Sequence, residues 1–232
     1  MKRYTIAIGA GVLISAASAF IFFGLGSFRE PCAYAAKEPA NVSLAKKAVR
    51  EYRTSGAWDA SIVCDVEKAK ALLQNYKPAA NKKPAVIFDI DDTALSNWAF
   101  IDISDFGYNH LNYKNWENSA QDVAIEPIKE LYLLARQKGF AIFFITGRRE
   151  VQRKFTERNL RKVGFDEWDG AFFKPMDYVG TSAGQFKTKW RTHIINMGYT
   201  LVLNIGDQQS DLDGEPQALY NIKIANPAYF IP

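Results

Sequence analysis

The chain has 232 residues, of which 48% are hydrophobic and 23% are charged, and its formal net charge is +4. This composition is typical of a globular protein and excludes a disordered chain, a collagen-like fibre and a disulfide-dense scaffold. The length suits one domain with a small appended element, and the small net charge gives no reason to expect nucleic-acid binding.

The first residues have the features of an export segment. Lys2 and Arg3 precede a stretch without charged residues that lasts until Arg29. It exceeds the roughly 7–15 residues of a signal-peptide core and approaches the roughly 20 residues that span a bilayer. Residues 1–36 are therefore predicted to be an export signal or a transmembrane anchor plus linker, and the length favours the anchor. The basic start should stay in the cytoplasm, so the remaining chain should reach the periplasm or cell envelope.

The chain contains two cysteines, Cys32 and Cys64. In an oxidising compartment such a pair can form one disulfide. The bond also needs a specific geometry, which a sequence does not reveal. One disulfide and two unpaired cysteines therefore both remain open.

Two helices are predicted ahead of the first strand. Ser43 is the expected N-cap of a helix that ends near Arg53. A second helix is predicted from about Trp58 to Tyr76, because apolar residues recur there at helical spacing. These apolar residues are Ile62, Val66, Ala69 and Leu73. Residues 77–83, which contain a proline, end this helical preface.

The pattern then changes to short apolar runs, which are typical of strands buried on both faces of a parallel sheet. The predicted strands are residues 85–88, 141–145, 171–173, 201–205 and 222–224, and the predicted helices among them are residues 127–139, 149–163 and 185–197. This alternation predicts an α/β, Rossmann-like three-layer fold with a mainly parallel sheet. Ligands of such sheets bind beyond the carboxyl ends of the strands.

Polar residues follow three of the predicted strands at that edge. They are Asp-Ile-Asp-Asp-Thr at 89–93, Thr-Gly-Arg at 146–148 and Gly-Asp-Gln-Gln-Ser-Asp at 206–211. Each group alone could cap a helix, but the three together indicate a functional site. The aspartates would repel one another unless a cation lay among them. Their oxygen ligands suit Mg²⁺.

A basic side chain is also needed, because a phosphate dianion tolerates nearby carboxylates only with Mg²⁺ and further cations or amide donors. Lys187 is the predicted cation, since it begins the helix before the strand at 201–205 and can reach the same edge. Lys174 is its rival. His110 and His193 have no partner at zinc-ligand spacing and are interpreted as surface or packing residues.

The combined pattern resembles the haloacid dehalogenase (HAD) superfamily of phosphotransferases. That pattern is Asp-x-Asp-x-Thr after one strand, Thr after the next, a Lys and then Gly-Asp-x-x-x-Asp. Residues 147–153 and 204–212 look more narrowly like the acid phosphatases related to plant vegetative storage proteins, the class B acid phosphatase group. The resemblance covers roughly Ser43 to Pro232. It implies a HAD-like phosphatase domain at 37–232 that depends on Mg²⁺ and hydrolyses small phosphate monoesters, and the N-terminal segment predicts that this domain is exported.

The resemblance implies catalytic roles, residue by residue. Asp89 matches the nucleophile, which becomes an aspartyl-phosphate. Asp91 matches the general acid and base, and Thr93 would orient it by a hydrogen bond. Asp211 would orient Lys187 or a metal-bound water.

The same resemblance implies the binding residues. Thr146, Gly147 and Lys187 would hold the phosphate. The implied Mg²⁺ ligands are Asp89, Asp207 and Asp91, the last through its backbone carbonyl. Asp92 lies inside the motif and is expected to have a structural hydrogen-bonding role.

Residues 97–125 are too many for a simple loop and are predicted to form a small cap over the site. They include the aromatic residues Trp98, Phe100, Phe106, Tyr108, Tyr113 and Trp116. Most should form the core of the cap. Trp98, just beyond the catalytic loop, is predicted to stack on an aryl or nucleobase leaving group, and Asn97 is a second candidate.

Two alternative functions remain open. One is a nucleotide-preferring phosphatase with the same chemistry. The other is a weakly active storage or binding protein on the same scaffold, although some storage members lack the nucleophile and this chain keeps Asp89. The expected partners are small-molecule phosphate monoesters, with no nucleic acid and with a membrane contact only through the N-terminal segment. A homodimer is compatible with the sequence.

Overall fold

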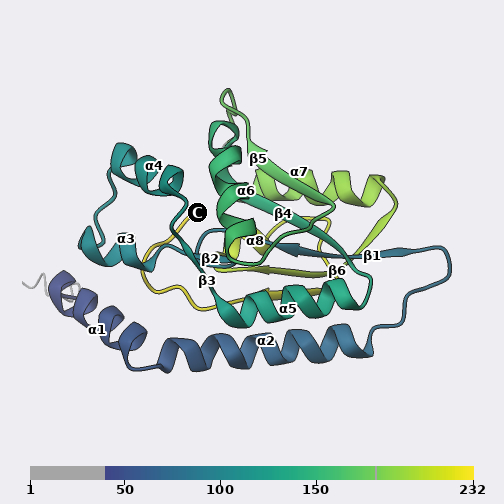
Figure 1. Ribbon diagram of the computed structural model, residues 1–232, viewed down its shortest axis with the longest axis horizontal. Helices are drawn as coiled ribbons and strands as arrows, with labels where there is room; N and C mark the ends of the chain where they lie inside the picture. The colour runs from purple at the N-terminus through teal and green to yellow at the C-terminus, as the bar shows by residue number, and fades with distance from the viewer. Residues whose placement is uncertain (1–39, 181) are drawn as a thin grey trace, which may run out of the picture. The chain divides into compact units, whose positions relative to one another are not determined.

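The computed structural model describes residues 40–180 and 182–232. Its centre is a five-stranded sheet in the order β5-β4-β1-β6-β7, in which all neighbours are parallel (Figure 1). The strands are β1 (Lys83–Phe88), β4 (Ala141–Arg149), β5 (Gly170–Lys174), β6 (Tyr199–Gly206) and β7 (Tyr220–Lys223). The predicted α/β class with a mainly parallel sheet is confirmed.

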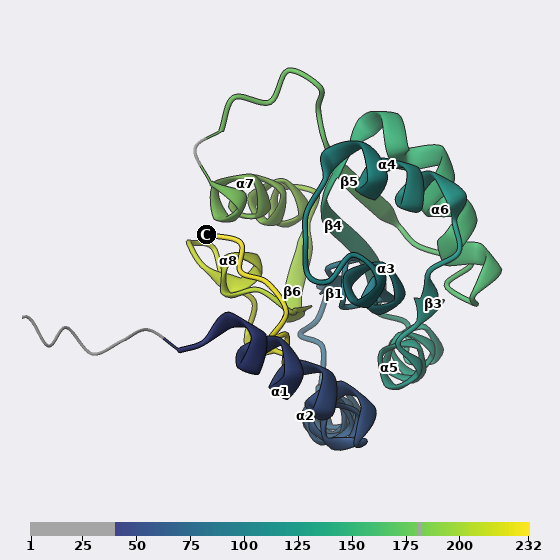
Figure 2. The same ribbon diagram turned by 90° about the vertical axis from the view of Figure 1, so that its left-hand side faces the viewer.

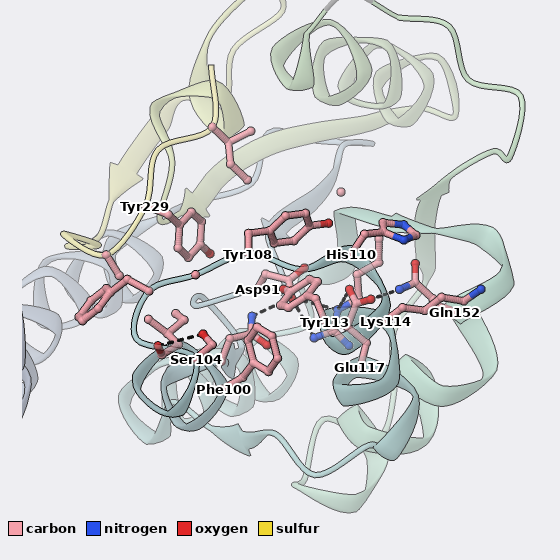
Figure 3. Close-up of a pocket in the computed structure, with 18 of the residues that line it drawn as sticks. Asp91, Phe100, Ser104, Tyr108, His110, Tyr113, Lys114, Glu117, Gln152 and Tyr229 are labelled. Carbon is pink, nitrogen blue, oxygen red and sulfur yellow. Dashed lines mark hydrogen bonds and ion pairs between the residues drawn. The ribbon is translucent and has the colours of Figure 1, made fainter. Parts of the chain in front are cut away.

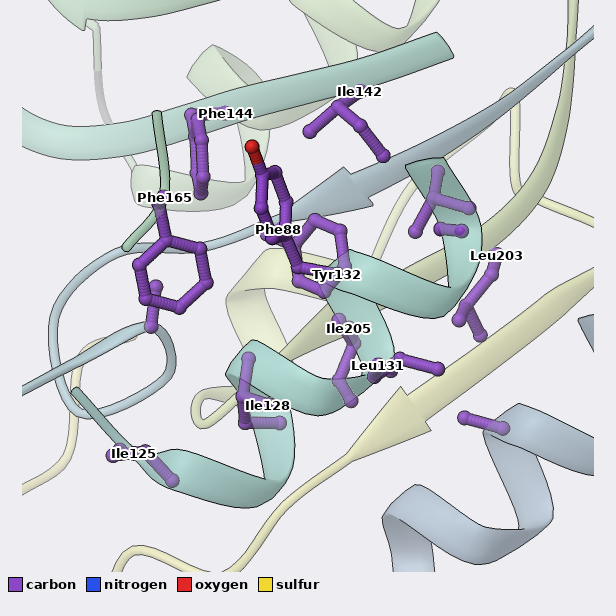
Figure 4. Close-up of a cluster of buried hydrophobic side chains, with 14 of the residues drawn as sticks. Phe88, Ile125, Ile128, Leu131, Tyr132, Ile142, Phe144, Phe165, Leu203 and Ile205 are labelled. Carbon is purple, nitrogen blue, oxygen red and sulfur yellow. The ribbon is translucent and has the colours of Figure 1, made fainter. Parts of the chain in front are cut away.

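Helices cover both faces of this sheet. One face carries α2 (Ala57–Asn75), α5 (Glu126–Gln137) and α6 (Arg153–Lys162), and the other carries α7 (Ala183–Asn196). The predicted apolar stripe of α2 is buried in the first core cluster. Figure 4 shows Phe88, Tyr132, Phe144 and Phe165 gathered in that cluster. Burying one such side chain contributes about 1.5–3 kcal/mol, so these aromatic contacts hold β1 and β4 against α5.

Two predicted helix starts were wrong. α1 (Val42–Thr54) is capped by Asn41 and not by Ser43, because the Asn41 side chain accepts hydrogen bonds from the backbone N–H groups of Ser43 and Leu44. The helix predicted from Arg149 begins at Arg153, after a 3₁₀ turn at Glu150–Gln152. Arg149 belongs to β4 instead, because it pairs with Lys174 of β5.

Residues 97–125, which were predicted to form a cap, are a helical insertion. It contains α3 (Trp98–Ile103) and α4 (His110–Ser119) and is framed by the antiparallel pair β2 (Leu95–Ser96) and β3 (Val123–Ala124). Figure 2 shows α3 and α4 at the end of the molecule that faces the viewer. α1 lies against the cap through exposed ion pairs, since Lys46 and Arg50 contact Asp105 at 2.6 and 2.8 Å.

Among the described residues, no helix is long and apolar enough to cross a membrane. The predicted export signal or anchor at 1–36 lies outside the described residues. So does Cys32, and with it the predicted disulfide. Cys64 is exposed on α2.

Candidate active site

The first cluster of charged side chains lies where β1 and β6 end. Lys187 of α7 places its ammonium 2.5 Å from Asp89 Oδ1 and 2.9 Å from Asp211 Oδ1, and it also donates to the carbonyl of Ile145. Asp207 follows β6, and Gly206 before it packs closely against Asp211. All four charged side chains are buried. The fold thus brings together the predicted nucleophile, the predicted cation and both later aspartates.

Burial controls the protonation of this cluster. Burial raises the pKa of Asp89 to about 7, with repulsion from Asp211 adding to the shift and Lys187 opposing it. Burial and the negative charges of Asp89 and Asp211 also raise the pKa of Asp207 well above its ordinary value. Conversely, these carboxylates raise the pKa of Lys187 in spite of its burial. One ammonium therefore does not balance three carboxylates.

The same three carboxylates fit a metal ion. One oxygen each from Asp89, Asp207 and Asp211 can be chosen so that all lie within 4.8 Å of one another. Carboxylate oxygens are the ligands of a hard cation such as Mg²⁺. Asp89 and Asp207 are among the predicted ligands, and Asp211 is an additional one. The predicted backbone carbonyl of Asp91 is not a side-chain group and stays a prediction.

Asp91 points instead to Arg148, which forms the centre of a second cluster. Asp91 Oδ1 lies 3.0 and 2.9 Å from Nε and Nη2 of Arg148, and it accepts further hydrogen bonds from Tyr113 and Asn97. Burial by itself would raise the pKa of Asp91, but the Arg148 guanidinium and these hydrogen bonds outweigh it and hold the pKa below its ordinary value. No role was predicted for Arg148 from the sequence. Its place directly after Thr146-Gly147 was the one feature that could have marked it as a site residue.

Arg148 also contacts two carboxyl groups of the cap segment. Its Nη2 lies 2.9 Å from Asp122 Oδ2, and its Nε lies 3.5 Å from Glu117 Oε1 on α4. Burial raises the pKa of Glu117 to about 8, with the charge of Asp91 adding to the shift and Arg148 opposing it. Glu117, the more distant of the two, therefore keeps its proton at neutral pH. Gln152 donates to its other oxygen.

The remaining predicted residues of the catalytic edge lie close to these clusters. The hydroxyl of Thr93 is 3.4 Å from Asp207 Oδ1. Thr93 therefore contacts Asp207, whereas a hydrogen bond to Asp91 had been predicted. The reason is that the chain turns back after Asp91, and Thr93 then faces β6. Thr146 is buried and accepts from the backbone N–H of Arg148 at 3.1 Å. Gly147 is exposed.

A cavity of about 540 Å³ opens beside Asp91, between the cap and the C-terminal residues (Figure 3). Its aromatic lining consists of Phe100, Phe106, Tyr108, Tyr113, Tyr229 and Phe230. Gly147 and Lys174 also line it, and His110 lies at its exposed side. Burial and the nearby charges of Lys187 and Arg149 lower the pKa of Lys174. Lys174 lines the cavity, whereas Lys187 contacts Asp89.

Trp98 does not line this cavity, contrary to the prediction. Its ring packs 6.0 Å from the ring of Phe106, and the guanidinium of Arg53 lies 4.9 Å from its centroid. Residues two positions apart on a helix face different sides, so Phe100 of α3 faces the cavity and Trp98 faces α1. Asn97 does line the cavity and donates to Asp91 at 2.9 Å.

The sequence model of one protein family matches residues 33–232, and its description is HAD superfamily, subfamily IIIB (acid phosphatase). The chain belongs to this family. Its members are phosphoric monoester hydrolases, so the predicted superfamily and the predicted reaction class are both confirmed. The match includes both charged clusters and the cap.

Individual relatives agree with the family. The chain is 28% identical to acid phosphatase 1 of Solanum lycopersicum over 79% of this chain and 73% of the relative. It is 30% identical to a class B acid phosphatase of Marinomonas sp. over 77% of this chain and 78% of the relative. It is 33% identical to a stem 31 kDa glycoprotein of Glycine max, of which it spans 59%.

A solved structure shares the fold. The class C acid phosphatase of Bacillus anthracis, in a crystal structure with tungstate bound, superposes with a TM-score of 0.66 over 82% of this chain and 86% of that chain. The two are 22% identical in sequence, so this likeness concerns the fold.

Proposed function

We propose that this acid phosphatase hydrolyses small phosphate monoesters through an aspartyl-phosphate on Asp89 and that it depends on Mg²⁺. The observation that carries the proposal is the buried Asp89 carboxylate at the carboxyl edge of the sheet, 2.5 Å from the ammonium of Lys187. Lys187 can orient the nucleophile and attract a phosphate dianion to it. Asp89, Asp207 and Asp211 would hold the Mg²⁺, which when bound supplies charge stabilisation of the phosphoryl oxygens.

The first step is attack of an Asp89 oxygen on phosphorus. The bond between phosphorus and the ester oxygen breaks, and the alcohol leaves with a proton from Asp91. The second step is hydrolysis, in which Asp91 takes a proton from water and the water oxygen attacks phosphorus. Inorganic phosphate leaves, and Asp89 is regenerated. Thr146 and Gly147 would donate hydrogen bonds to phosphate oxygens.

The position of Asp91 suits both of these proton transfers. It lines the cavity, which is where the leaving group of a bound ester would lie. Arg148 favours its ionised form, and ionised Asp91 is the form that activates water. To act as the acid it must first bind a proton, so activity should increase toward acidic pH as long as saturating Mg²⁺ keeps Asp89 ionised.

The aromatic lining of the cavity favours a second, narrower candidate, a phosphatase that prefers nucleotides. Phe100 and Tyr113 pack edge to face at 5.3 Å, and Tyr108 lies 5.6 Å from Tyr113. Rings of this kind stack on flat leaving groups such as nucleobases or aryl groups. The retained Asp89 and Lys187 argue against a storage or binding protein with little turnover.

The decisive experiment is hydrolysis of p-nitrophenyl phosphate by the full chain in mild detergent, with Mg²⁺ and with a chelator. We expect turnover with Mg²⁺, loss with the chelator and loss in Asp89→Asn. A ³²P label on the wild-type protein that is stable in acid and released by hydroxylamine would identify the acyl-phosphate. Asp89→Asn should not acquire this label. Chelator-resistant turnover would contradict the Mg²⁺ proposal, and turnover in Asp89→Asn would contradict the nucleophile.

We also propose that the protein is exported and that residues 1–36 direct it to the periplasm or cell envelope. The support is the Lys2-Arg3 start followed by the long uncharged stretch. Cell fractionation with an antibody against the folded domain tests this, since membrane-bound protein of full length indicates an anchor and soluble, shortened protein indicates a cleaved signal. Protein found in the cytoplasm would exclude both.

A further inference from the structure

The last residues of the chain, 226–232, lie across the catalytic edge, and we call them the C-terminal strap. Figure 3 shows Tyr229 beside the cavity, next to Tyr108. Within the strap, Asn226 donates to Asp207 Oδ2 at 2.6 Å, and the hydroxyl of Tyr229 donates to Asp92 Oδ2 at 2.9 Å. The strap therefore links the loop after β6 to the loop after β1.

Two further hydrogen bonds hold the end of the strap in place. The backbone N–H of Ile231 donates to the Gln208 side chain at 3.0 Å, and its carbonyl accepts from the Ser210 hydroxyl at 2.9 Å. Gln208 in turn donates to Asp207 at 2.6 Å. Tyr229 thus lies between two fixed points, Asn226 and Ile231, which limit the positions open to its hydroxyl.

The hydroxyl of Tyr229 begins a chain of contacts that ends at Asp91. Asp92 accepts from Tyr229 with one oxygen and from the backbone N–H of Asn97 at 3.0 Å with the other. Asn97 then donates through its side-chain amide to Asp91 Oδ1 at 2.9 Å. Asp92 has a φ of +50°, a left-handed conformation that non-glycine residues seldom adopt, so these contacts also hold an unfavourable turn of the backbone.

The orientation of the Asn97 side chain depends on its contact with Asp92. Asn97 is buried, and its own side-chain oxygen has no hydrogen-bond partner in the part of the chain that the structure describes. A carboxylate only accepts hydrogen bonds, so the amide nitrogen must face Asp91. The orientation of this amide therefore depends on where Asp92 places the backbone of Asn97.

We propose that Tyr229 is a positioning residue for Asp91 and acts through Asp92 and Asn97. The inference rests on the proposed function, in which Asp91 protonates the departing alcohol. Loss of the Tyr229 hydroxyl leaves a buried oxygen of Asp92 without its donor, and Asp92 and Asn97 then shift. A displacement of about 1 Å in a catalytic group can reduce the rate by about 100-fold, so a partial shift of Asp91 is enough to be measured.

The test compares Tyr229→Phe with the wild type on two substrates. p-Nitrophenolate is a good leaving group and needs little protonation, whereas the alkoxide from glycerol 2-phosphate leaves only with a proton. For Tyr229→Phe we expect kcat/KM on glycerol 2-phosphate to fall by about 10-fold or more, because a general acid contributes about 100-fold or more. On p-nitrophenyl phosphate the expected change is at most about twofold. Tyr220→Phe, the same chemical change on the exposed part of β7, should leave both values unchanged.

Asn97→Ala supplies the second variant, since it breaks the last contact and leaves the strap intact. It should show the same selective loss, and combining it with Tyr229→Phe should add little, because residues of one chain of contacts are not additive. Equal losses on both substrates, or additive losses in the double variant, would overturn the proposal. If Tyr229→Phe does not fold, Asn97→Ala decides it by the same selectivity. Absence of turnover in the wild type would instead count against the proposed function.

Discussion

The two charged clusters of this protein combine the same kinds of charged group in different environments. Each contains three carboxyl groups and one cation, and all of these side chains are buried except that of Asp91, which is 19% exposed. The catalytic cluster consists of Asp89, Asp207, Asp211 and Lys187. The cap-side cluster consists of Asp91, Glu117, Asp122 and Arg148. In each, a single positive charge faces as many as three negative ones, and each needs a further source of charge balance.

The clusters reach that balance in different ways. The cap-side cluster lies under the cap, where Trp116 donates to Asp122 at 2.5 Å and Gln152 donates to Glu117. A proton on Glu117 removes one of its negative charges. The catalytic cluster offers one oxygen from each aspartate within 4.8 Å and so can accept a divalent cation. The catalytic cluster thus keeps a negative charge that a divalent cation can balance, whereas the cap-side cluster balances part of its charge internally.

The largest effect on activity should come from Lys187→Met. Loss of this charge should reduce turnover by roughly 1,000-fold, because it removes a fixed group that stabilises the transferred phosphoryl group. It also leaves three carboxylates without a cation, so the protein should unfold more easily, and Mg²⁺ should restore part of that stability. Steady-state kinetics and urea unfolding with and without Mg²⁺ measure both effects. Unchanged turnover would remove Lys187 from the mechanism.

Arg148→Met should have the largest effect on stability. Breaking a buried ion pair by removing one partner costs about 3–5 kcal/mol. Here we expect no rescue by Mg²⁺, because among the described residues only Asp89, Asp207 and Asp211 are grouped closely enough to hold a metal ion. We expect partial rescue at acidic pH, where the carboxyl groups of the cluster take up protons. Urea unfolding near pH 5 and pH 8 measures this, with Lys154→Met on exposed α6 as the control. Rescue by Mg²⁺ would show that the two clusters do not differ as described.

Mg²⁺ binding to the wild type should depend on pH. Asp89 has a pKa of about 7 in the metal-free protein, so below this pH a proton must leave before the carboxylate binds metal. Affinity should therefore weaken as pH falls below 7, by up to about tenfold per pH unit for each proton displaced. Calorimetric titration near pH 5.5 and 7.5 measures this. Equal affinities at both values would contradict the raised pKa.

The smallest effect should come from Glu117→Gln. The Glu117 carboxyl has a pKa of about 8 in the folded protein and 4.5 as its ordinary value, so the unfolded chain ionises first as pH rises. Stability from protonated Glu117 is complete below pH 4.5 and is lost as pH rises through 8. The variant keeps a neutral side chain and should lose less stability between pH 5 and pH 8 than the wild type. Activity should change by less than about twofold. Parallel stability curves would show that Glu117 does not hold the proton.

The metal-capable cluster was largely predictable from the sequence. Asp89 and Asp207 directly follow apolar strands that run in parallel, and the carboxyl ends of such strands meet at one edge. The cap-side cluster was not predicted, although Arg148 lay inside the quoted motif. Its partners Glu117 and Asp122 come from the cap and its return segment, where an acidic residue in a polar stretch has no feature that marks it as buried.

The aromatic residues show the same division. The insertion at 97–125 and its richness in aromatic residues were evident in the sequence, but Trp98 was selected for its nearness to the motif and faces α1 instead of the cavity. The direction of a side chain on a short helix depends on which surfaces the helix packs against. In this protein one side of α3 packs against α1 and the other side faces the cavity.

The sequence by itself determined the order of the polar motifs along the chain and the parallel α/β class, because these follow from local hydrophobic periodicity and from residues adjacent to strand ends. Its resemblance to the HAD superfamily pointed to Asp89 as the candidate nucleophile. Only the tertiary structure decided which oxygen faces which donor: Asp91 toward Arg148, Thr93 toward Asp207 and the C-terminal strap toward Asp92. Such contacts join residues up to 137 positions apart, and their geometry is set by packing, of which a linear pattern carries no record.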